Sequence, residues 1–199
     1  MISEFKKRLL TSLWIIPLTL FFLFKGSIFF IFFLSLIFFI SVYEWFNITK
    51  NLKVFKIAGT ILIILSIYSA YLIRENQGAN TFIFIILISV LTDLGGYIFG
   101  KTFRGPKLTK ISPNKTYSGV LGGFILPIIG GIMFYNFYMM NFQLRVEHYI
   151  PVFIFIFVIS LINQIGDLII SFFKRKAKIK NTGKILPGHG GLLDRIDGI

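Results

Sequence analysis

The chain has 199 residues, of which 55% are hydrophobic and 15% are charged, and its mean hydropathy is +0.80. Soluble globular domains carry about 25% charged residues, so this composition excludes an ordinary soluble protein and favours the membrane class. The formal net charge is +13 and cysteine is absent, which excludes disulfides, thiolate catalysis and cysteine-based zinc sites.

Six apolar segments approach the roughly 20 residues that a membrane-spanning helix needs. In chain order they are about Leu9–Phe24, Ser27–Tyr43, Ile57–Ile73, Thr81–Phe99, Gly119–Met140 and Tyr149–Ile170. The first contains Pro17 and lacks a small-residue cleavage site, so it is predicted to be a retained span rather than a removed signal peptide. The sequence therefore predicts an all-α, polytopic membrane protein with about six transmembrane helices, forming a single domain over residues 1–199.

Basic residues are distributed unevenly between the two sets of connecting segments. With the N-terminus taken as cytoplasmic, 18 of the 21 Lys and Arg residues fall on the cytoplasmic side and 3 on the opposite side. This asymmetry follows the positive-inside rule, and it places both termini, the 100–118 loop and the 171–199 C-terminal segment in the cytoplasm. It also accounts for much of the net charge without a nucleic-acid partner.

Two of the apolar segments contain polar residues where lipid is expected. A carboxylate within a span costs about 2.5–3.5 kcal/mol on insertion scales, so Asp93 and Asp167 are functional candidates. The alternative for Asp93 is a helix-end carboxylate that caps the helix or reaches the interface. Asn163 precedes Asp167 by one helical turn and is expected to make an interhelical hydrogen bond. Gly96 and Gly100 predict a close approach by another helix.

The acidic residues divide into two groups. The aspartates, which all lie on the predicted cytoplasmic side, are Asp93, Asp167, Asp194 and Asp197. The glutamates lie near membrane boundaries and are interpreted as ordinary surface residues; they are Glu4, Glu44, Glu75 and Glu147. Clustered carboxylates beside many cations predict a site where Mg²⁺ bridges phosphate oxygens and Lys or Arg neutralises the remaining charge.

The loop before the fifth apolar segment suits phosphate, because Ser112 to Thr116 offer hydroxyls and an ammonium group at the start of a helix. The alternative is a solvated basic loop that contacts anionic lipid and sets the topology. The C-terminal segment has a similar alternative. Attraction to lipid, however, does not explain why this segment contains PGHGG followed by DRID.

These motifs resemble those of the CDP-diacylglycerol synthases, also called phosphatidate cytidylyltransferases. The blocks that carry the resemblance are Asp93-x-Gly95-Gly96-Tyr97-x-x-Gly100, the SPNKT block that starts at Ser112, Gly166-Asp167-Leu168, and a C-terminal block comprising Ser171, Lys174-Arg175, Lys180-Asn181, Gly183, Pro187, His189-Gly190-Gly191 and Asp194-Arg195-Ile196-Asp197. Glu44-Trp45 after the second segment is also similar. Order and spacing agree from about Phe5 to the end.

The resemblance implies a reaction of CTP with phosphatidic acid to give CDP-diacylglycerol and pyrophosphate in phospholipid biosynthesis. It also implies Mg²⁺, with room for a second cation. The implied catalytic residues are Asp167, Asp194 and Lys115, and the implied metal ligands are Asp167 and Asp194, followed by Asp93 and Asp197. The implied phosphate-binding residues are Ser112, Lys174, Arg175, His189 and Arg195. The Gly190-Gly191 pair is expected to allow close backbone approach.

The implied partners are CTP, phosphatidic acid and membrane lipid, with no nucleic acid, and a homodimer is compatible with the sequence. The implied location is the bacterial inner (plasma) membrane, with the site on the cytoplasmic side, formed by the 100–118 loop and the 171–199 segment.

Two alternatives remain open. Family members usually continue into a further span, so a chain that stops at Ile199 is expected to lack a final C-terminal span. Acidic residues of the family are replaced by Ile170 and Asn181, and Ser118 stands where many members have Glu or Gln. One alternative is therefore a truncated or degenerate non-catalytic homologue that binds anionic lipid or nucleotide. The other is a transporter of an anionic substrate, which is disfavoured because HGG and DRID lie outside the spans.

Overall fold

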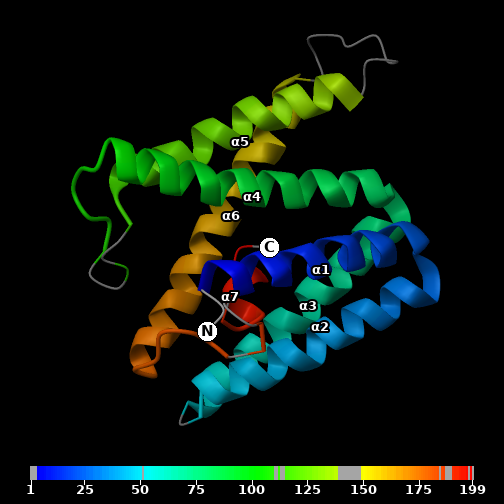
Figure 1. Cartoon of the computed structure of the whole chain (residues 1–199), viewed down its shortest axis with the longest axis vertical. Coiled ribbons are helices and arrows are strands. Elements are labelled where there is room, and N and C mark those ends of the chain that lie inside the picture. The colour runs from blue at the N-terminus through cyan, green and yellow to red at the C-terminus, as the bar shows by residue number, and fades with distance from the viewer. Residues whose placement is uncertain are drawn as a thin grey trace. The chain divides into compact units, whose positions relative to one another are not determined.

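The computed structural model describes residues 4–50, 52–109, 112, 115–138, 149–183, 185–186, 190–196 and 198, and of residues 4, 5, 7–10, 138 and 149 it describes only the helical backbone. The helices are α1 (Glu4–Lys25), α2 (Ser27–Ile48), α3 (Lys53–Gln77), α4 (Ala79–Thr102), α5 (Tyr117–Tyr138), α6 (Tyr149–Lys176) and the short α7 (Leu193–Ile196) (Figure 1). The prediction of an all-α fold is confirmed for this part of the chain.

Five of the described helices, α2 to α6, are long and apolar enough to cross a membrane. Large apolar side chains such as Phe39, Val54 and Phe137 are exposed on their outer faces, as expected for surfaces that face lipid. The chain is a multi-pass integral membrane protein. In α1 the apolar part, Thr11–Lys25, is shorter, so the sixth span stays a prediction.

Most helices extend further than the apolar segments that predicted them; the exception is α5, because the predicted segment Gly119–Met140 runs past Tyr138, the last described residue of that helix. Ile57–Ile73, for example, lies inside α3, which runs from Lys53 to Gln77. The difference arises because an apolar segment marks the hydrocarbon core, whereas helical hydrogen bonding continues into the interface.

The described chain divides into two compact units, one of Met1–Phe82 with Phe173–Ile196 and one of Ile83–Phe172 with Asp197–Ile199. The boundaries fall inside α4 and α6, and each unit is described by itself. The single-domain assignment stays a prediction.

In the first unit, Arg74 of α3 closes the turn between α1 and α2. Gly26 at this turn has a φ of 64°, and a Cβ there would collide with the Arg74 guanidinium. The Arg74 side chain donates through Nε to the carbonyl oxygen of Leu23 at 3.2 Å and pairs with Glu75 at 2.7 Å. Three helices are thereby joined at one end, and α1 and α2 run side by side from this turn (Figure 1).

At the opposite end of α2, the indole of Trp45 joins α3 to the end of α6. Its Nε1–H lies 3.2 Å from the carbonyl oxygen of Phe55 and 3.1 Å from that of Lys56. Gly59 lies against the indole, where a Cβ would collide with the ring. The ring of Phe173 meets the indole edge to face at 4.9 Å. Trp45 is 4% exposed, so this contact forms part of the core of the unit.

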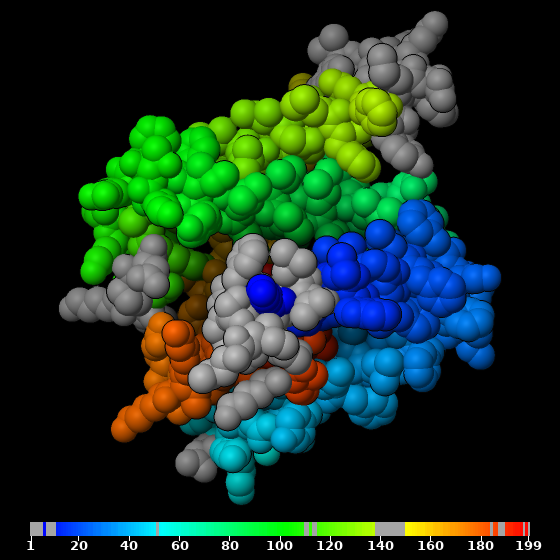
Figure 2. Space-filling model, viewed as in Figure 1, coloured from blue at the N-terminus to red at the C-terminus, as the bar shows by residue number. Residues whose placement is uncertain are grey.

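In the second unit, α4 and α5 approach each other along glycine residues (Figure 2 draws them as neighbouring green bands). A Cβ at Gly95 would collide with the carbonyl oxygen of Gly122. A Cβ at Gly96 would lie 3.6 Å from the carbonyl oxygen of Gly119, and one at Gly100 would lie 3.6 Å from the Gly119 Cα. The predicted close approach of a helix to Gly96 and Gly100 is confirmed, and Gly95 lies even closer to the partner backbone.

The packing of Gly95 predicts that Gly95→Ala destabilises the chain by about 1–3 kcal/mol. The added methyl group would collide with the carbonyl oxygen of Gly122, and a helix backbone cannot move aside as a flexible side chain can. Thermal unfolding in detergent, followed by helical circular dichroism, measures this loss. Gly96→Ala is the matched control, since its Cβ would make only an ordinary contact. Equal stability of the two variants would contradict the close approach at Gly95.

Candidate functional site

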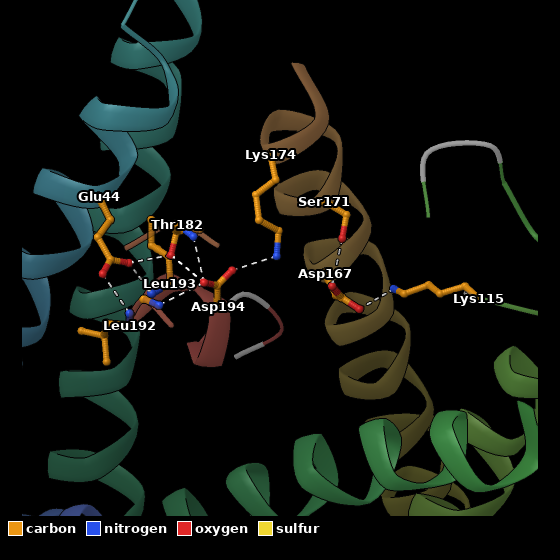
Figure 3. Close-up of polar contacts among 10 residues, drawn as sticks. Glu44, Lys115, Asp167, Ser171, Lys174, Thr182, Leu192, Leu193 and Asp194 are labelled. Atoms are coloured by element: carbon orange, nitrogen blue, oxygen red, sulfur yellow. Dashed lines mark hydrogen bonds and ion pairs between the residues drawn. The ribbon is translucent and has the colours of Figure 1, made fainter. Parts of the chain in front are cut away.

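The carboxylate of Glu44 lies at the centre of a buried polar cluster in the first unit. Glu44 is in the last turns of α2 and is 0% exposed. Its Oε1 accepts a hydrogen bond from the N–H of Leu192 at 3.0 Å, and its Oε2 accepts from the N–H of Leu193 at 2.9 Å (Figure 3). Thr182 Oγ1 lies 2.8 Å from the same Oε2. The interpretation of Glu44 as a surface residue is wrong, because the C-terminal segment covers this side chain.

Asp194, in the first turn of α7, is surrounded by donors in the same unit. Its Oδ2 accepts from the N–H groups of Thr182 at 2.8 Å and Gly191 at 3.0 Å, and Thr182 Oγ1 lies at 3.1 Å. Its Oδ1 lies 2.8 Å from the ammonium nitrogen of Lys174, and the side chain is 8% exposed (Figure 3). Thr182 therefore lies between two carboxylates, those of Glu44 and Asp194.

The end of α6 turns the chain toward this cluster. Lys178 has a φ of 56°, the left-handed conformation that commonly ends a helix. The N–H of Lys178 donates to the carbonyl oxygen of Arg175, and that of Ile179 donates to the carbonyl oxygen of Lys174, both at 3.0 Å. This Schellman-type ending satisfies the last carbonyl groups of the helix and starts the segment that carries Thr182.

In the second unit, the loop before α5 holds Lys115 by its backbone. The N–H of Leu108 donates to the carbonyl oxygen of Lys115 at 2.8 Å, and the N–H of Tyr117 donates to that of Pro106 at 3.2 Å. Thr116 caps α5, since its Oγ1 accepts from the N–H of Gly119 at 3.1 Å. The chain direction at Lys115 is thus fixed on both sides.

Lys115 and Asp167 form an ion pair within this unit. The ammonium nitrogen lies 2.5 Å from Asp167 Oδ2, and the hydroxyl of Ser171, one turn later on α6, donates to Oδ1 at 3.3 Å (Figure 3). The side chains of Lys115 and Asp167 are 25% and 33% exposed. The structure therefore brings together two of the predicted catalytic residues.

Polar side chains also connect α4 to α6 in the second unit. Asn163, which is 1% exposed, donates through Nδ2 to Asp93 Oδ1 at 2.9 Å. Thr92 and Ser160, both buried, are hydrogen-bonded at 3.1 Å. The prediction that Asn163 makes an interhelical hydrogen bond is confirmed. Within a membrane no water is present, so these polar side chains must find their hydrogen-bond partners inside the protein.

Comparison with known proteins extends the observations from single residues to most of the chain. A model described as the Cytidylyltransferase family matches residues 52–199. The chain belongs to this family. It is 36% identical to the phosphatidate cytidylyltransferase of Rickettsia conorii over 78% of the chain and 69% of that protein. The Rickettsia typhi protein of the same name is 37% identical over 78% and 70%. That of Staphylococcus saprophyticus is 41% identical over 62% and 46%.

The other predicted site residues of this cytidylyltransferase-family chain differ in their burial, and some of them lie outside the described residues. Ser112 is half-buried and donates its N–H to Thr109 Oγ1 at 3.2 Å, whereas Arg175 and Arg195 are exposed. His189 and Asp197 lie outside the described residues, as do Pro113, Asn114 and Pro187 of the quoted motifs. Their roles stay predictions.

The predicted Mg²⁺ fits Asp167 better than Asp194. A carboxylate has about four lone-pair sites, so Asp167, with two hydrogen-bonding partners and partial exposure, keeps capacity for a cation. Asp194 has donors on both oxygens and is largely enclosed. The described residues contain no group of three His, Cys, Asp or Glu that could hold a metal ion. Mg²⁺ usually takes one or two carboxylates together with substrate phosphates and water, so a single, partly exposed aspartate is compatible with it.

Glu44 and Thr182 are the residues of the cluster that sequence reasoning missed. The similarity of Glu44-Trp45 to the family was a signal, but it carried no indication of burial. Thr182 lies beside Asn181 in a polar segment, and such neighbours suggest that its side chain is exposed. Gly191 was expected to permit close backbone approach, and the structure shows what approaches it: a Cβ there would collide with Thr182 Oγ1.

The donors around Asp194 predict a pH-dependent contribution to stability. Burial raises the pKa of Asp194, but the hydrogen bonds from Lys174, Thr182 and Gly191 outweigh burial and bring the pKa below the ordinary 3.8. The folded state therefore binds fewer protons than the unfolded state, and the stabilisation is present above the ordinary pKa and lost as the pH falls through the folded-state value.

Asp194→Asn is thus expected to lower the free energy of unfolding by about 2 kcal/mol at pH 7. The difference from the wild-type chain should shrink as the pH falls below the ordinary pKa of 3.8, where the unfolded carboxylate takes up a proton, and should be lost only below the still lower pKa of the folded state. Unfolding in detergent at several pH values measures it. A difference that stays constant from pH 7 to the lowest pH at which the chain folds would contradict this electrostatic origin.

Proposed function

We propose that this chain transfers the cytidylyl group of CTP to phosphatidic acid and produces CDP-diacylglycerol and pyrophosphate. The observation that carries the proposal is the identity of 36–37% across 78% of the chain to Rickettsia proteins named phosphatidate cytidylyltransferase. A multi-pass membrane protein can receive a lipid substrate laterally from the bilayer, which agrees with this reaction. The degenerate, non-catalytic alternative is not favoured, because relatives named phosphatidate cytidylyltransferase match most of the chain.

In this reaction, a phosphate oxygen of phosphatidic acid attacks the α-phosphorus of CTP. The bond from that phosphorus to the oxygen bridging to the β-phosphate breaks, and pyrophosphate leaves with the electron pair. Phosphatidic acid is already anionic near neutral pH, so the step requires little general-base catalysis. The contribution of the protein is to orient two anions and to neutralise the developing charge.

The cationic side chains would supply that neutralisation. Lys115 is the strongest candidate, since its backbone is fixed by the loop and its ammonium group is partly exposed. Lys174, Arg175 and Arg195 are proposed to bind the triphosphate or the lipid phosphate. Lys174 has a second role, because it also holds Asp194.

Magnesium dependence is part of the proposal. Mg²⁺ would neutralise the triphosphate and polarise the α-phosphate. Asp167 is proposed to hold it, because its carboxylate keeps free acceptor capacity and is partly exposed. Asp194 could contribute only if Lys174 moved away from Oδ1. Participation of Asp93, Asp197 or a second cation, like the homodimer, stays a prediction.

The proposed location is the bacterial inner membrane, with the active site on the cytoplasmic side. The support is the distribution of charge, 18 basic residues on one side against 3 on the other. CTP is a cytoplasmic nucleotide, so this orientation places the basic loop and the C-terminal segment where the nucleotide is found.

A turnover assay with radiolabelled CTP, phosphatidic acid in detergent and Mg²⁺ tests the proposal. The wild-type chain is expected to form CDP-diacylglycerol, and chelation of Mg²⁺ should abolish the product. Asp167→Asn and Lys115→Met should each lower kcat/KM by about 100-fold or more, because the first removes the proposed Mg²⁺ ligand and the second removes a cation proposed to neutralise the phosphates. Lys107→Met is the matched control, since Lys107 is an exposed lysine of the same loop.

The absence of product from a folded wild-type chain would reject the proposed activity. Product formation with equal rates for Asp167→Asn and the wild-type chain would leave the activity intact and reject the metal-binding role of Asp167.

A further inference from the structure

We propose that Glu44 is a positioning residue for the reaction, holding the C-terminal segment so that Asp194 and Arg195 take their working places. This inference rests on the proposed function. Glu44 belongs to α2, and no hydrogen bond joins it directly to Asp194. Its effect would pass through Thr182 and through the backbone of residues 191–193.

The first argument is the set of donors that Glu44 accepts. The N–H groups of Leu192 and Leu193 lie at the start of α7, where a helix has no internal acceptors for its first N–H groups. Glu44 supplies the acceptor from a distant helix. Because the carboxylate is fully buried, losing it would leave these donors without a partner and without access to water.

The second argument is the space left around the carboxylate. A Cβ at Gly183 would collide with Glu44 Oε1, and a Cβ at Gly191 would lie 2.5 Å from Glu44 Oε2. Two glycines far apart in the loop therefore pass close to the same carboxylate from two directions. Such a fit constrains the backbone directly after Thr182 and directly before Leu192.

The third argument is the route from Glu44 to Asp194. Thr182 Oγ1 lies 2.8 Å from Glu44 and 3.1 Å from Asp194, but its hydroxyl has one proton and can donate to one carboxylate at a time. The N–H groups of Thr182 and Gly191 donate to Asp194 Oδ2. Asp194 therefore has one donor residue that Glu44 contacts directly, Thr182, and one that directly precedes a residue bonded to Glu44, Gly191; its remaining donor is Lys174.

Glu44→Gln tests this arrangement with little change in shape. The carboxylate accepts hydrogen bonds on both oxygens, whereas the amide has one oxygen and one NH₂ group, so at least one backbone N–H of α7 would face a donor. Glu75→Gln is the matched control, because Glu75 pairs with Arg74 at the other end of the unit.

The position of the segment can be measured without any activity. The chain has no cysteine, so Leu193→Cys introduces a single thiol at a residue that is 4% exposed. We expect slow maleimide labelling of the full-length chain in detergent when Glu44 is intact. Adding Glu44→Gln should raise the labelling rate by about tenfold or more, since local opening governs access. Adding Glu75→Gln should not.

The kinetic test separates positioning from general stability. Glu44→Gln should lower kcat per folded molecule by roughly 10- to 100-fold, as losses of supporting hydrogen bonds do, with a smaller change in KM for CTP. Thr182→Val should lower kcat in the same way, and Thr182→Ser, which keeps the hydroxyl, should lose much less. This pair also decides the question if Glu44→Gln fails to accumulate as folded protein.

The proposal is overturned if Glu44→Gln keeps both the slow labelling and the wild-type kcat. It is also overturned if labelling becomes fast while kcat per folded molecule is unchanged, because the carboxylate then serves stability alone. A wild-type chain without turnover would reject the proposed activity, and the labelling experiment would still show whether Glu44 holds the segment.

Discussion

A carboxylate buried at the end of a membrane helix must find hydrogen-bond donors inside the protein, and this requirement organises the first unit. The donors to Glu44 lie 138 to 149 residues later in the chain. Because burial of an unpaired carboxylate is costly, the C-terminal segment can close only in the arrangement that brings those donors to Glu44. The placement of Asp194 follows, since two of its donors belong to the same backbone turns.

Charge balance is a second constraint, and each unit meets it separately. Asp167 is paired with Lys115 in one unit, and Asp194 is paired with Lys174 in the other. Breaking either pair by removing one partner would leave a partly buried charge without compensation. The helix α6 supplies Asp167 to the second unit and Lys174 to the first, so a single continuous helix carries a charged residue of both pairs.

The sequence predicted those features that depend on local pattern. Apolar segments located α2 to α6, the spacing of Gly96 and Gly100 indicated a close helix contact, and the position of Asn163 indicated an interhelical hydrogen bond. Each follows from residues within a turn or two of one another, or from the chemistry of a polar group in lipid.

The features that it did not predict are contacts between residues far apart in the chain. In the sequence, Glu44 looks like a residue at the membrane surface, because its neighbours Tyr43 and Trp45 are aromatic residues typical of the membrane–water interface. Its hydrogen-bond partners, Thr182, Leu192 and Leu193, come from the part of the chain that follows the left-handed turn at Lys178. Arg74 is a similar case, since a lone arginine between apolar segments gives no sign that it holds the carbonyl oxygen of Leu23.

The structure explains why glycine is required at three positions near the C-terminus. A Gly-Gly pair beside basic residues suggests a backbone that approaches a phosphate. Gly190 has a φ of 92°, which favours glycine on conformational grounds alone. A Cβ at Gly183 would collide with the Glu44 carboxylate, and a Cβ at Gly191 would collide with Thr182 Oγ1 and with the same carboxylate. The requirement for glycine therefore arises in part from a carboxylate of the protein itself. Gly191, which belongs to the pair that suggested a phosphate-binding loop, packs against the buried side chain of Glu44.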